Sequence, residues 1–338
     1  MSIIATGIGS LPGEDLRGAL THVLGGFEHA WLPELPARGI GADMIGRSLA
    51  MTEGLGFDLQ PQGWRLTDAS GRDHARARGL LRRDLDDLEE LAQGFGGSIT
   101  LTVAGPLTLA ACLERARGDK VLADHGARRE MAESLGIGVS GLLAELARRL
   151  PDVTWWVQLD EPLLPAVLAG RVPTASGFSR LRSLDAPRAG ELLRRVTGPV
   201  RTGAARVTVH CCAPGMDLGL LGGSGADGVG VDAVSLDVAT LRPADLDCLA
   251  GWLEAGRDAV LGLAPTASPD QVSTPDQIVR RGLDLLRPLQ LDPQLLLERL
   301  AVSTACGLAG WSVRAAITQL DALPEAAVLL AEQLVTSG

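Results

Sequence analysis

The strongest constraint on the fold is a repeated alternation between short apolar runs and amphipathic segments with helical periodicity. The apolar runs have the length and composition of buried strands. Amphipathic segments such as 82–92, 130–149 and 274–289 separate several of them. Repeated strand–helix alternation favours parallel pairing, because a parallel neighbour requires a crossover connection. The predicted strands span residues 3–8, 30–35, 99–103, 154–159, 207–211, 233–238, 259–264 and 300–304.

Eight such strands in 338 residues predict an α/β fold of the (β/α)8 TIM-barrel type, with residues 1–338 forming one catalytic domain. An open doubly wound sheet is the alternative. The turn after the first strand lacks the dinucleotide-binding pattern of such sheets, because Pro12 stands where the third glycine would be. The polar segment 54–73 has little periodicity and is expected to form an insertion over one face of the barrel.

Composition limits the classes of partner and compartment. A net charge of −10 argues against nucleic acid or an acidic membrane as the main partner. Five cysteines are too few for a disulfide scaffold in a chain of this size, which favours a reducing compartment. The first residues lack the features of a signal peptide, and no apolar run reaches the roughly 18 residues of a membrane span. We therefore expect a cytoplasmic protein.

Reactive and polar residues follow the C-terminal ends of most of the predicted strands. In a barrel these ends converge on one mouth, where active sites are built. Such residues from separate strands therefore predict one site at that mouth. They are Ser10, the 105–108 turn, Asp160 with Glu161, His210 with Cys212, Asp237, and Cys306.

The pair His210 and Cys212 gives this site its chemical character. Side chains two apart on a strand share a face, so these two project together while Cys211 turns away. Asp237 ends the next strand and Cys306 ends the last one. Nitrogen, oxygen and two sulfur donors suit tetrahedral zinc, although the spacing is not that of a zinc ribbon, so the fold itself would have to assemble the site. A metal-bound thiol is deprotonated, so such a site could activate a substrate thiol.

Each of these residues also has an ordinary structural interpretation. A cysteine such as Cys306 can be a small buried hydrophobe. Asp237 could cap the turn after its strand, and Asp160 with Glu161 could cap the following helix. The turn at 105–108 could be no more than a turn.

Five motifs in order resemble the catalytic C-terminal barrel of the cobalamin-independent methionine synthase family. Each stands at a predicted strand end, and the likeness spans most of the chain. The motifs are Ile8-Gly9-Ser10-Leu11-Pro12, Gly105-Pro106-Leu107-Thr108, Asp160-Glu161-Pro162, His210-Cys211-Cys212 and Cys306-Gly307-Leu308.

The resemblance assigns roles by position. It implies that homocysteine is the thiol substrate and Zn2+ the cofactor. Asp160 would pair with the ammonium group of homocysteine and is the expected catalytic residue. The implied zinc ligands are His210, Cys212, Cys306 and Asp237, the last in place of the family's glutamate, and the implied substrate-binding residues are Ile8, Gly9, Ser10, Asp160 and Glu161.

The chain departs from the family mainly on the folate side. It has about half the length of the two-barrel enzyme. No aromatic residue occurs at 109–112, where the family stacks a tryptophan on the pterin, and the family's Asp-x-His is replaced by 264–267. The glutamate that follows strand two in the family has only Glu34 as a candidate here.

These features together predict a zinc-dependent methyltransferase that transfers a methyl group to the thiolate of homocysteine and so makes methionine. The donor is expected to be a methyl-corrinoid or methyl-folate, and the departures on the folate side favour the methyl-corrinoid. Two alternatives remain at this point. One is a barrel like the uroporphyrinogen decarboxylases, and the other is a non-catalytic zinc- or thiol-binding homologue.

Overall fold

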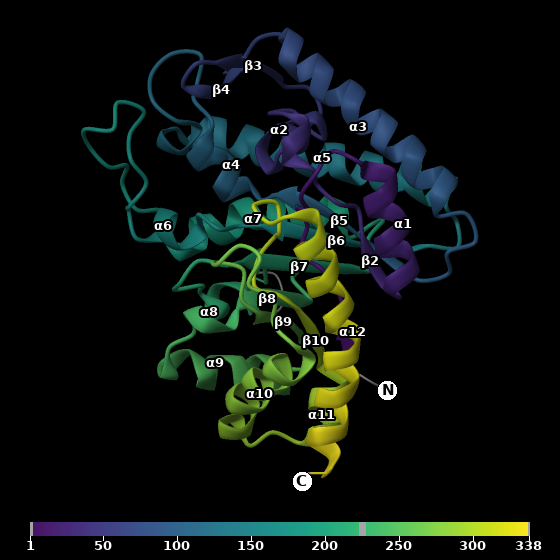
Figure 1. The fold of residues 1–338 in the computed structure, drawn as a ribbon. Coiled ribbons are helices and arrows are strands. Elements are labelled where there is room, and N and C mark those ends of the chain that lie inside the picture. The colour runs from purple at the N-terminus through teal and green to yellow at the C-terminus, as the bar shows by residue number, and fades with distance from the viewer. Residues whose placement is uncertain (1–2, 223–227, 337–338) are drawn as a thin grey trace.

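The computed structural model describes residues 3–222 and 228–336. Eight parallel strands form one sheet in the order β1-β10-β9-β8-β7-β6-β5-β2, curved into a nearly closed barrel with helices around it (Figure 1). This confirms the predicted TIM barrel. The strands are β1 Ile4–Ala5, β2 His29–Trp31, β5 Ser98–Ala104, β6 Thr154–Asp160, β7 Arg206–Cys211, β8 Ala233–Asp237, β9 Asp258–Ala264 and β10 Leu300–Thr304.

The helices follow the predicted amphipathic segments, and two of them begin earlier than predicted. The 82–92 segment belongs to a helix that begins at Arg72, and the 130–149 segment to one that begins at His125. Side chains at the N-termini explain several starts: Asp124 caps α5 and Thr274 makes a capping box for α10. The helices are α1 Leu16–Gly26, α2 Met44–Ala50, α3 Arg72–Leu91, α4 Pro106–Cys112, α5 His125–Arg149, α6 Leu164–Leu168, α7 Ala186–Val200, α8 Leu218–Leu221, α9 Pro243–Glu254, α10 Pro275–Leu286, α11 Pro293–Arg299 and α12 Val313–Thr336. None of the helices in the described ranges is both long and apolar enough to cross a membrane.

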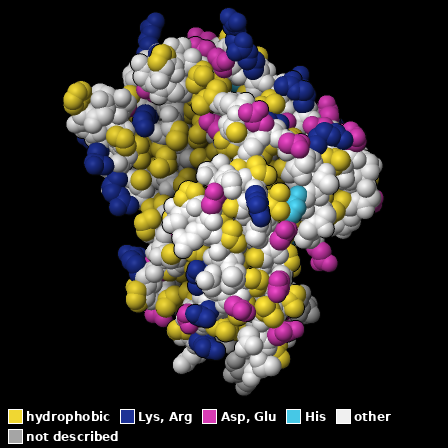
Figure 2. All heavy atoms as spheres, in the orientation of Figure 1, with side chains coloured by type: hydrophobic (Ala, Val, Ile, Leu, Met, Phe, Trp, Pro, Cys, Tyr) yellow, Lys and Arg dark blue, Asp and Glu magenta, His cyan; other side chains and the backbone are white. Residues whose placement is uncertain are grey.

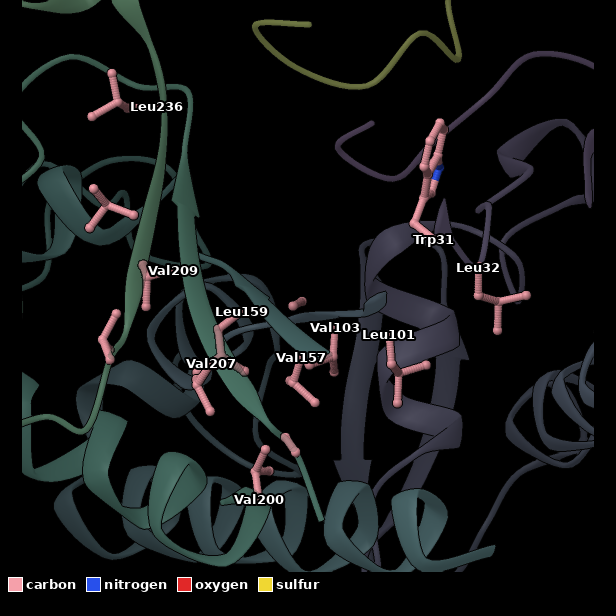
Figure 3. Close-up of a cluster of buried hydrophobic side chains, with 14 of the residues drawn as sticks. Trp31, Leu32, Leu101, Val103, Val157, Leu159, Val200, Val207, Val209 and Leu236 are labelled. Carbon is pink, nitrogen blue, oxygen red and sulfur yellow. The ribbon is translucent and has the colours of Figure 1, made fainter. Parts of the chain in front are cut away.

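Alternation along the central strands separates an apolar face from a polar one. On β6, Val157 and Leu159 are buried among apolar side chains that include Val200 of α7 (Figure 3). The residues between and after them, Gln158 and Asp160, are polar and equally buried. The same pattern recurs on β5 and β7, so a polar layer lines one face of the strands. Buried polar groups need partners, which makes this layer the place to look for a site.

The barrel closes between β1 and β2 through residues just beyond the two strands. Ser10 and Glu34 form a parallel bridge. The Leu11 N–H donates to the Glu34 carbonyl at 2.8 Å, and the Glu34 N–H donates to the Gly9 carbonyl at 3.3 Å. Two predicted site segments, 8–10 and the loop after strand two, are thereby joined at the mouth.

The segment 54–73 contains an antiparallel pair, β3 Gly56–Gln60 and β4 Gly63–Thr67. The pair lies apart from the barrel sheet, near α3 and α4 (Figure 1). The Leu66 N–H donates to the carbonyl of Glu114, in the loop after α4, at 2.8 Å.

Candidate metal centre and acceptor site

Three of the predicted zinc ligands come together at the barrel mouth. His210 lies near the end of β7, Cys212 follows that strand, and Cys306 follows β10. One ligand atom from each lies within 4.8 Å of the others, and the sulfur atoms of Cys212 and Cys306 are 3.3 Å apart. The strand alternation that predicted a shared face for His210 and Cys212 is therefore confirmed.

The imidazole of His210 is held by one nitrogen and open at the other. Nδ1 lies 2.9 Å from the hydroxyl of Ser235, which stands opposite His210 in the β7–β8 register. Nε2 is buried and has no hydrogen-bond partner among the described residues. A buried nitrogen without a partner is costly unless a ligand binds to it. Sequence reasoning missed Ser235, although it shares a strand face with Asp237 and alternation could have indicated it.

The contact between the two sulfur atoms moves the pKa values of the two thiols in opposite directions. This contact with Cys212 and the proximity of His210 hold the pKa of Cys306 well below its usual range. The same contact raises the pKa of Cys212 above its usual range. Cys211 points away, is fully buried, and has its pKa raised by burial to about 12. An unpartnered imidazole nitrogen beside a thiol–thiolate pair suits a thiophilic divalent cation.

Asp237 lies outside this group of ligand atoms. Its carboxylate accepts a hydrogen bond from the Ala239 N–H at 2.9 Å and so caps the turn that follows β8. Burial raises its pKa. The capping interpretation therefore describes its present contacts, and its role as the fourth ligand stays a prediction.

Asp160 and Gln158 form one side of a second buried cluster. This cluster lies beside the sulfur atoms of Cys212 and Cys306. Gln158 donates both to the Asp160 carboxylate at 2.8 Å and to the Ile8 carbonyl at 2.7 Å. Burial raises the pKa of Asp160 well above its usual range, and the nearby acids Glu34 and Cys306 raise it further. Asp160 thus lies next to both the 8–10 segment and the metal centre.

Glu34 forms the other side of this cluster together with Arg47 of α2. The Glu34 carboxylate lies 3.1 Å from the Arg47 guanidinium and accepts from the Thr102 hydroxyl at 3.2 Å. Glu34 and Arg47 are 4% and 3% exposed, so the pair is shielded from water. Sequence reasoning raised Glu34 only as a candidate and missed Arg47 and Thr102. The position of Thr102, two residues before the end of β5 and on its polar face, was the available signal.

Ser10 is joined to the loop that carries Cys306. The Leu308 N–H donates to the Ser10 carbonyl at 2.7 Å. A side chain at Gly307 would overlap the Ser10 hydroxyl, so glycine is required there. Movement of the 8–10 segment would therefore shift the loop that carries Cys306.

Glu161 turns away from this cluster and supports α4. Its carboxylate accepts from the Leu107 N–H, the Thr108 N–H and the Thr108 hydroxyl at 2.7–2.9 Å. The side chain fills the space beside Gly105, where a Cβ would clash with it. Burial raises the pKa of Glu161 to about 7, against these hydrogen bonds. Its predicted contact with substrate stays a prediction.

A groove of about 560 Å³ opens between α6, α8 and α9. It is bounded by loops that follow β6, β7 and β8, and its apolar lining includes Leu168, Met216 and Leu241. Figure 2 shows apolar side chains gathered in a hollow on one face of the molecule. The groove lining shares Leu236 with β8 and comes within three residues of Cys212 at Gly215.

Comparison with known families assigns the chain. Residues 102–328, about two thirds of its length, match the family described as cobalamin-independent synthase, catalytic domain. The chain belongs to this family. The match includes the segments that carry Asp160, His210, Cys212 and Cys306, and it confirms the resemblance found in the sequence motifs.

Solved structures agree with this synthase-domain fold. A B12-independent methionine synthase from Shewanella sp. W3-18-1, in complex with selenomethionine, is 14% identical with a TM-score of 0.64, covering 99% of this chain and 100% of that chain. The GH5_18 protein from Streptomyces cattleya, in complex with GlcNAc, is 15% identical with a TM-score of 0.50, covering 100% of this chain and 82% of that chain. At these identities the likeness concerns the fold. No curated protein sequence matches the chain.

Proposed function

We propose that this protein is a zinc-dependent methyltransferase that transfers a methyl group to the thiolate of homocysteine, forming methionine. The observation that carries the proposal is the buried, unpartnered Nε2 of His210 beside the sulfur atoms of Cys212 and Cys306. Family membership supports it. The match is to the synthase domain, so the decarboxylase-like alternative is not carried forward.

The residues present fit zinc. His210, Cys212 and Cys306 would hold the metal, with Asp237 as the candidate fourth ligand. Zinc bound there would favour the thiolate form of an acceptor sulfur. Ser235 would keep the His210 ring oriented, as partners of metal-binding histidines commonly do.

The second cluster would hold the amino-acid part of the acceptor. Its ammonium group would lie between the carboxylates of Asp160 and Glu34, and its backbone against the 8–10 segment. In the reaction the thiol loses its proton to solvent, a lone pair of the sulfur forms the S–CH3 bond, and the electron pair of the bond between the methyl carbon and the donor leaves with the donor. The Shewanella methionine synthase was solved in complex with selenomethionine, the selenium analogue of the product expected here.

We propose a methyl-corrinoid as the donor. In the family the residues after the 105–108 turn include a tryptophan that stacks on the pterin. Here Leu109, Ala110 and Ala111 are buried in α4 and offer no such surface. The groove between α6, α8 and α9 would offer a large donor an apolar surface on which to dock.

Metal content tests the central claim. Protein purified without a metal-affinity tag should hold about one zinc per chain by plasma mass spectrometry. Zinc-edge X-ray absorption should show one more sulfur neighbour after homocysteine is added. Zinc without methyl transfer from any donor would favour the non-catalytic alternative.

Cysteine variants sharpen this test. Cys306→Ser should lose zinc and transfer activity together. Cys248→Ser is the matched control for zinc content, because this exposed cysteine belongs to α9 and lies outside the ligand group. Full activity in Cys306→Ser, or absence of zinc in the wild type, would refute the proposal.

A further inference from the structure

Arg47 is a charged residue of the mouth to which neither the sequence motifs nor the proposed transfer chemistry gives a role. It lies on α2, whose N-terminus is capped by Asp43, and it is 3% exposed. One guanidinium nitrogen, Nη1, contacts both Glu34 at 3.1 Å and the Thr102 hydroxyl at 3.2 Å. The other, Nη2, donates to the Leu32 carbonyl at 3.4 Å. Arg47 thus reaches from a helix outside the strands to the acidic cluster.

The contacts of the two carboxylates leave one oxygen free on each. The contacts of Glu34 with Arg47 and with Thr102 both fall on Oε1. The contact of Asp160 with Gln158 falls on Oδ1. Among the described residues, Glu34 Oε2 and Asp160 Oδ2 therefore remain to accept from a bound group. Gly9 stands beside Thr102, so the 8–10 segment runs next to this cluster.

Two neighbouring buried carboxylates do not both ionise without a compensating cation. Burial raises the pKa of Glu34, while Arg47 and Thr102 act against that rise. The other charged groups facing this pair are Asp43 of α2 and Asp160 of β6, and both are acidic. Arg47 is the cation that pairs with this cluster among the described residues.

We propose that Arg47 is a specificity-determining residue that keeps Glu34 ionised, so that the pocket selects an acceptor carrying an ammonium group beside its thiol. Arg47 acts through Glu34 and is a positioning residue for the ammonium group. This inference rests on the proposed function. Without Arg47, burial would favour the neutral form of Glu34 more strongly, and the ammonium group would be less firmly held by one of its two anionic partners.

Ligand pairs that differ only in the amino group provide the test. Calorimetric Kd values would be measured for L-methionine and for its des-amino analogue, 4-(methylthio)butanoate, and these measurements need no methyl donor. Arg47→Met should weaken L-methionine about tenfold at pH 7 and leave the analogue within about twofold. The L-methionine affinity of this variant should rise with pH as Glu34 ionises, and Arg47→Lys should restore it to within about threefold of wild type.

Two further variants separate this role from support of the fold. Ser48→Ala removes a buried hydrogen bond from the Ala104 N–H to the same helix and should leave the ratio of the two Kd values unchanged. In a Glu34→Gln background, Arg47→Met should have no more than about a twofold further effect, because the buried pair is removed as a whole. This double variant also serves if the single variant does not fold.

Equal weakening of both ligands in Arg47→Met, or the same effect in Ser48→Ala, would overturn the inference alone. Failure of the wild type to bind L-methionine or homocysteine would overturn the proposed function, and the inference with it.

Discussion

The two ends of the barrel each bury a histidine, and they treat it in opposite ways. At the N-terminal end, His29 of β2 has both ring nitrogens paired, with the hydroxyls of Ser98 and Thr100. Its ring also packs against Trp156, with centroids 3.6 Å apart. At the C-terminal end, His210 has one nitrogen paired and the other buried without a partner among the described residues.

A buried polar group that has hydrogen-bond partners costs less free energy than one that has none. At this N-terminal end the Arg206 guanidinium also lies over the Trp156 ring. The Asp258 carboxylate forms ion pairs with Arg206 and Arg299. Such a network of paired groups contributes to stability. The open nitrogen of His210 is a stability cost that binding would recover. The difference indicates that the polar residues at the N-terminal end of the barrel stabilise the fold, whereas those at the C-terminal mouth are available for chemistry.

Removing His210 should give the largest effect on function. His210→Ala deletes one of the three grouped ligands, so zinc affinity should fall by roughly a hundredfold or more, and methyl transfer with it. The free energy of unfolding of the metal-free protein should fall by less than in His29→Ala, by about 1–2 kcal/mol, because only the Ser235 hydroxyl loses its partner and Nε2 makes no bond. Zinc titration and urea denaturation measure the two quantities. Unchanged zinc affinity would mean that the mouth histidine is as structural as His29.

Removing His29 should give the converse result. His29→Ala strands two buried hydroxyls and opens a space beside Trp156, at a cost of about 2–4 kcal/mol in stability with zinc binding retained. Burial, with Arg206 nearby, lowers the pKa of His29 to about 3. A histidine with a lowered pKa contributes its stability fully above the unfolded-state pKa near 6.5 and loses it as the pH falls toward 3.

The loss of folding stability at acid pH tests this role of His29. Urea denaturation at pH 7.5 and pH 5 should show a smaller acid-induced loss in His29→Ala than in wild type, by about 1–2 kcal/mol. An equal loss in both proteins would show that His29 does not cause the fall in stability at acid pH.

Glu161 should give the smallest effect, with the opposite sign. Burial raises its pKa from 4.5 to about 7, so its contribution to stability is complete below 4.5 and is lost as the pH rises through 7. Glu161→Gln cannot titrate. The loss of stability between pH 5 and pH 7.5 should therefore shrink by about 2 kcal/mol relative to wild type, as measured by urea denaturation. A larger loss in the variant would show that the carboxylate is favoured by its three donors more than it is opposed by burial.

Local patterns predicted the fold and the core of the site. All eight predicted strands exist. They could be predicted because a short apolar run bounded by helical segments is a pattern of residues close in sequence. The grouping of His210 with Cys212 followed from strand alternation, and that of Cys306 from the convergence of strand ends in a barrel.

Contacts set by tertiary packing were beyond sequence reasoning. The position of Arg47 depends on how α2 lies across the end of β5, and no periodicity in residues 44–50 indicates it. Asp237 shows a related limit. The pattern placed it at the right strand end, but its side chain caps a local turn, and a one-residue cap and a metal ligand look alike in sequence.

The closure of the barrel has a consequence for the order of events during synthesis. β1 finds its strand partner in β10, with Ile4 paired to Ala301, and the Ser10–Glu34 bridge completes the ring. The proposed acceptor pocket includes Ser10, whose carbonyl accepts from the Leu308 N–H, so the pocket cannot be complete until the last strand has left the ribosome and docked. Loop closure over so long a separation is slow. A nascent chain would thus hold a folded middle, with β5 to β8 already paired, long before it could recognise a substrate.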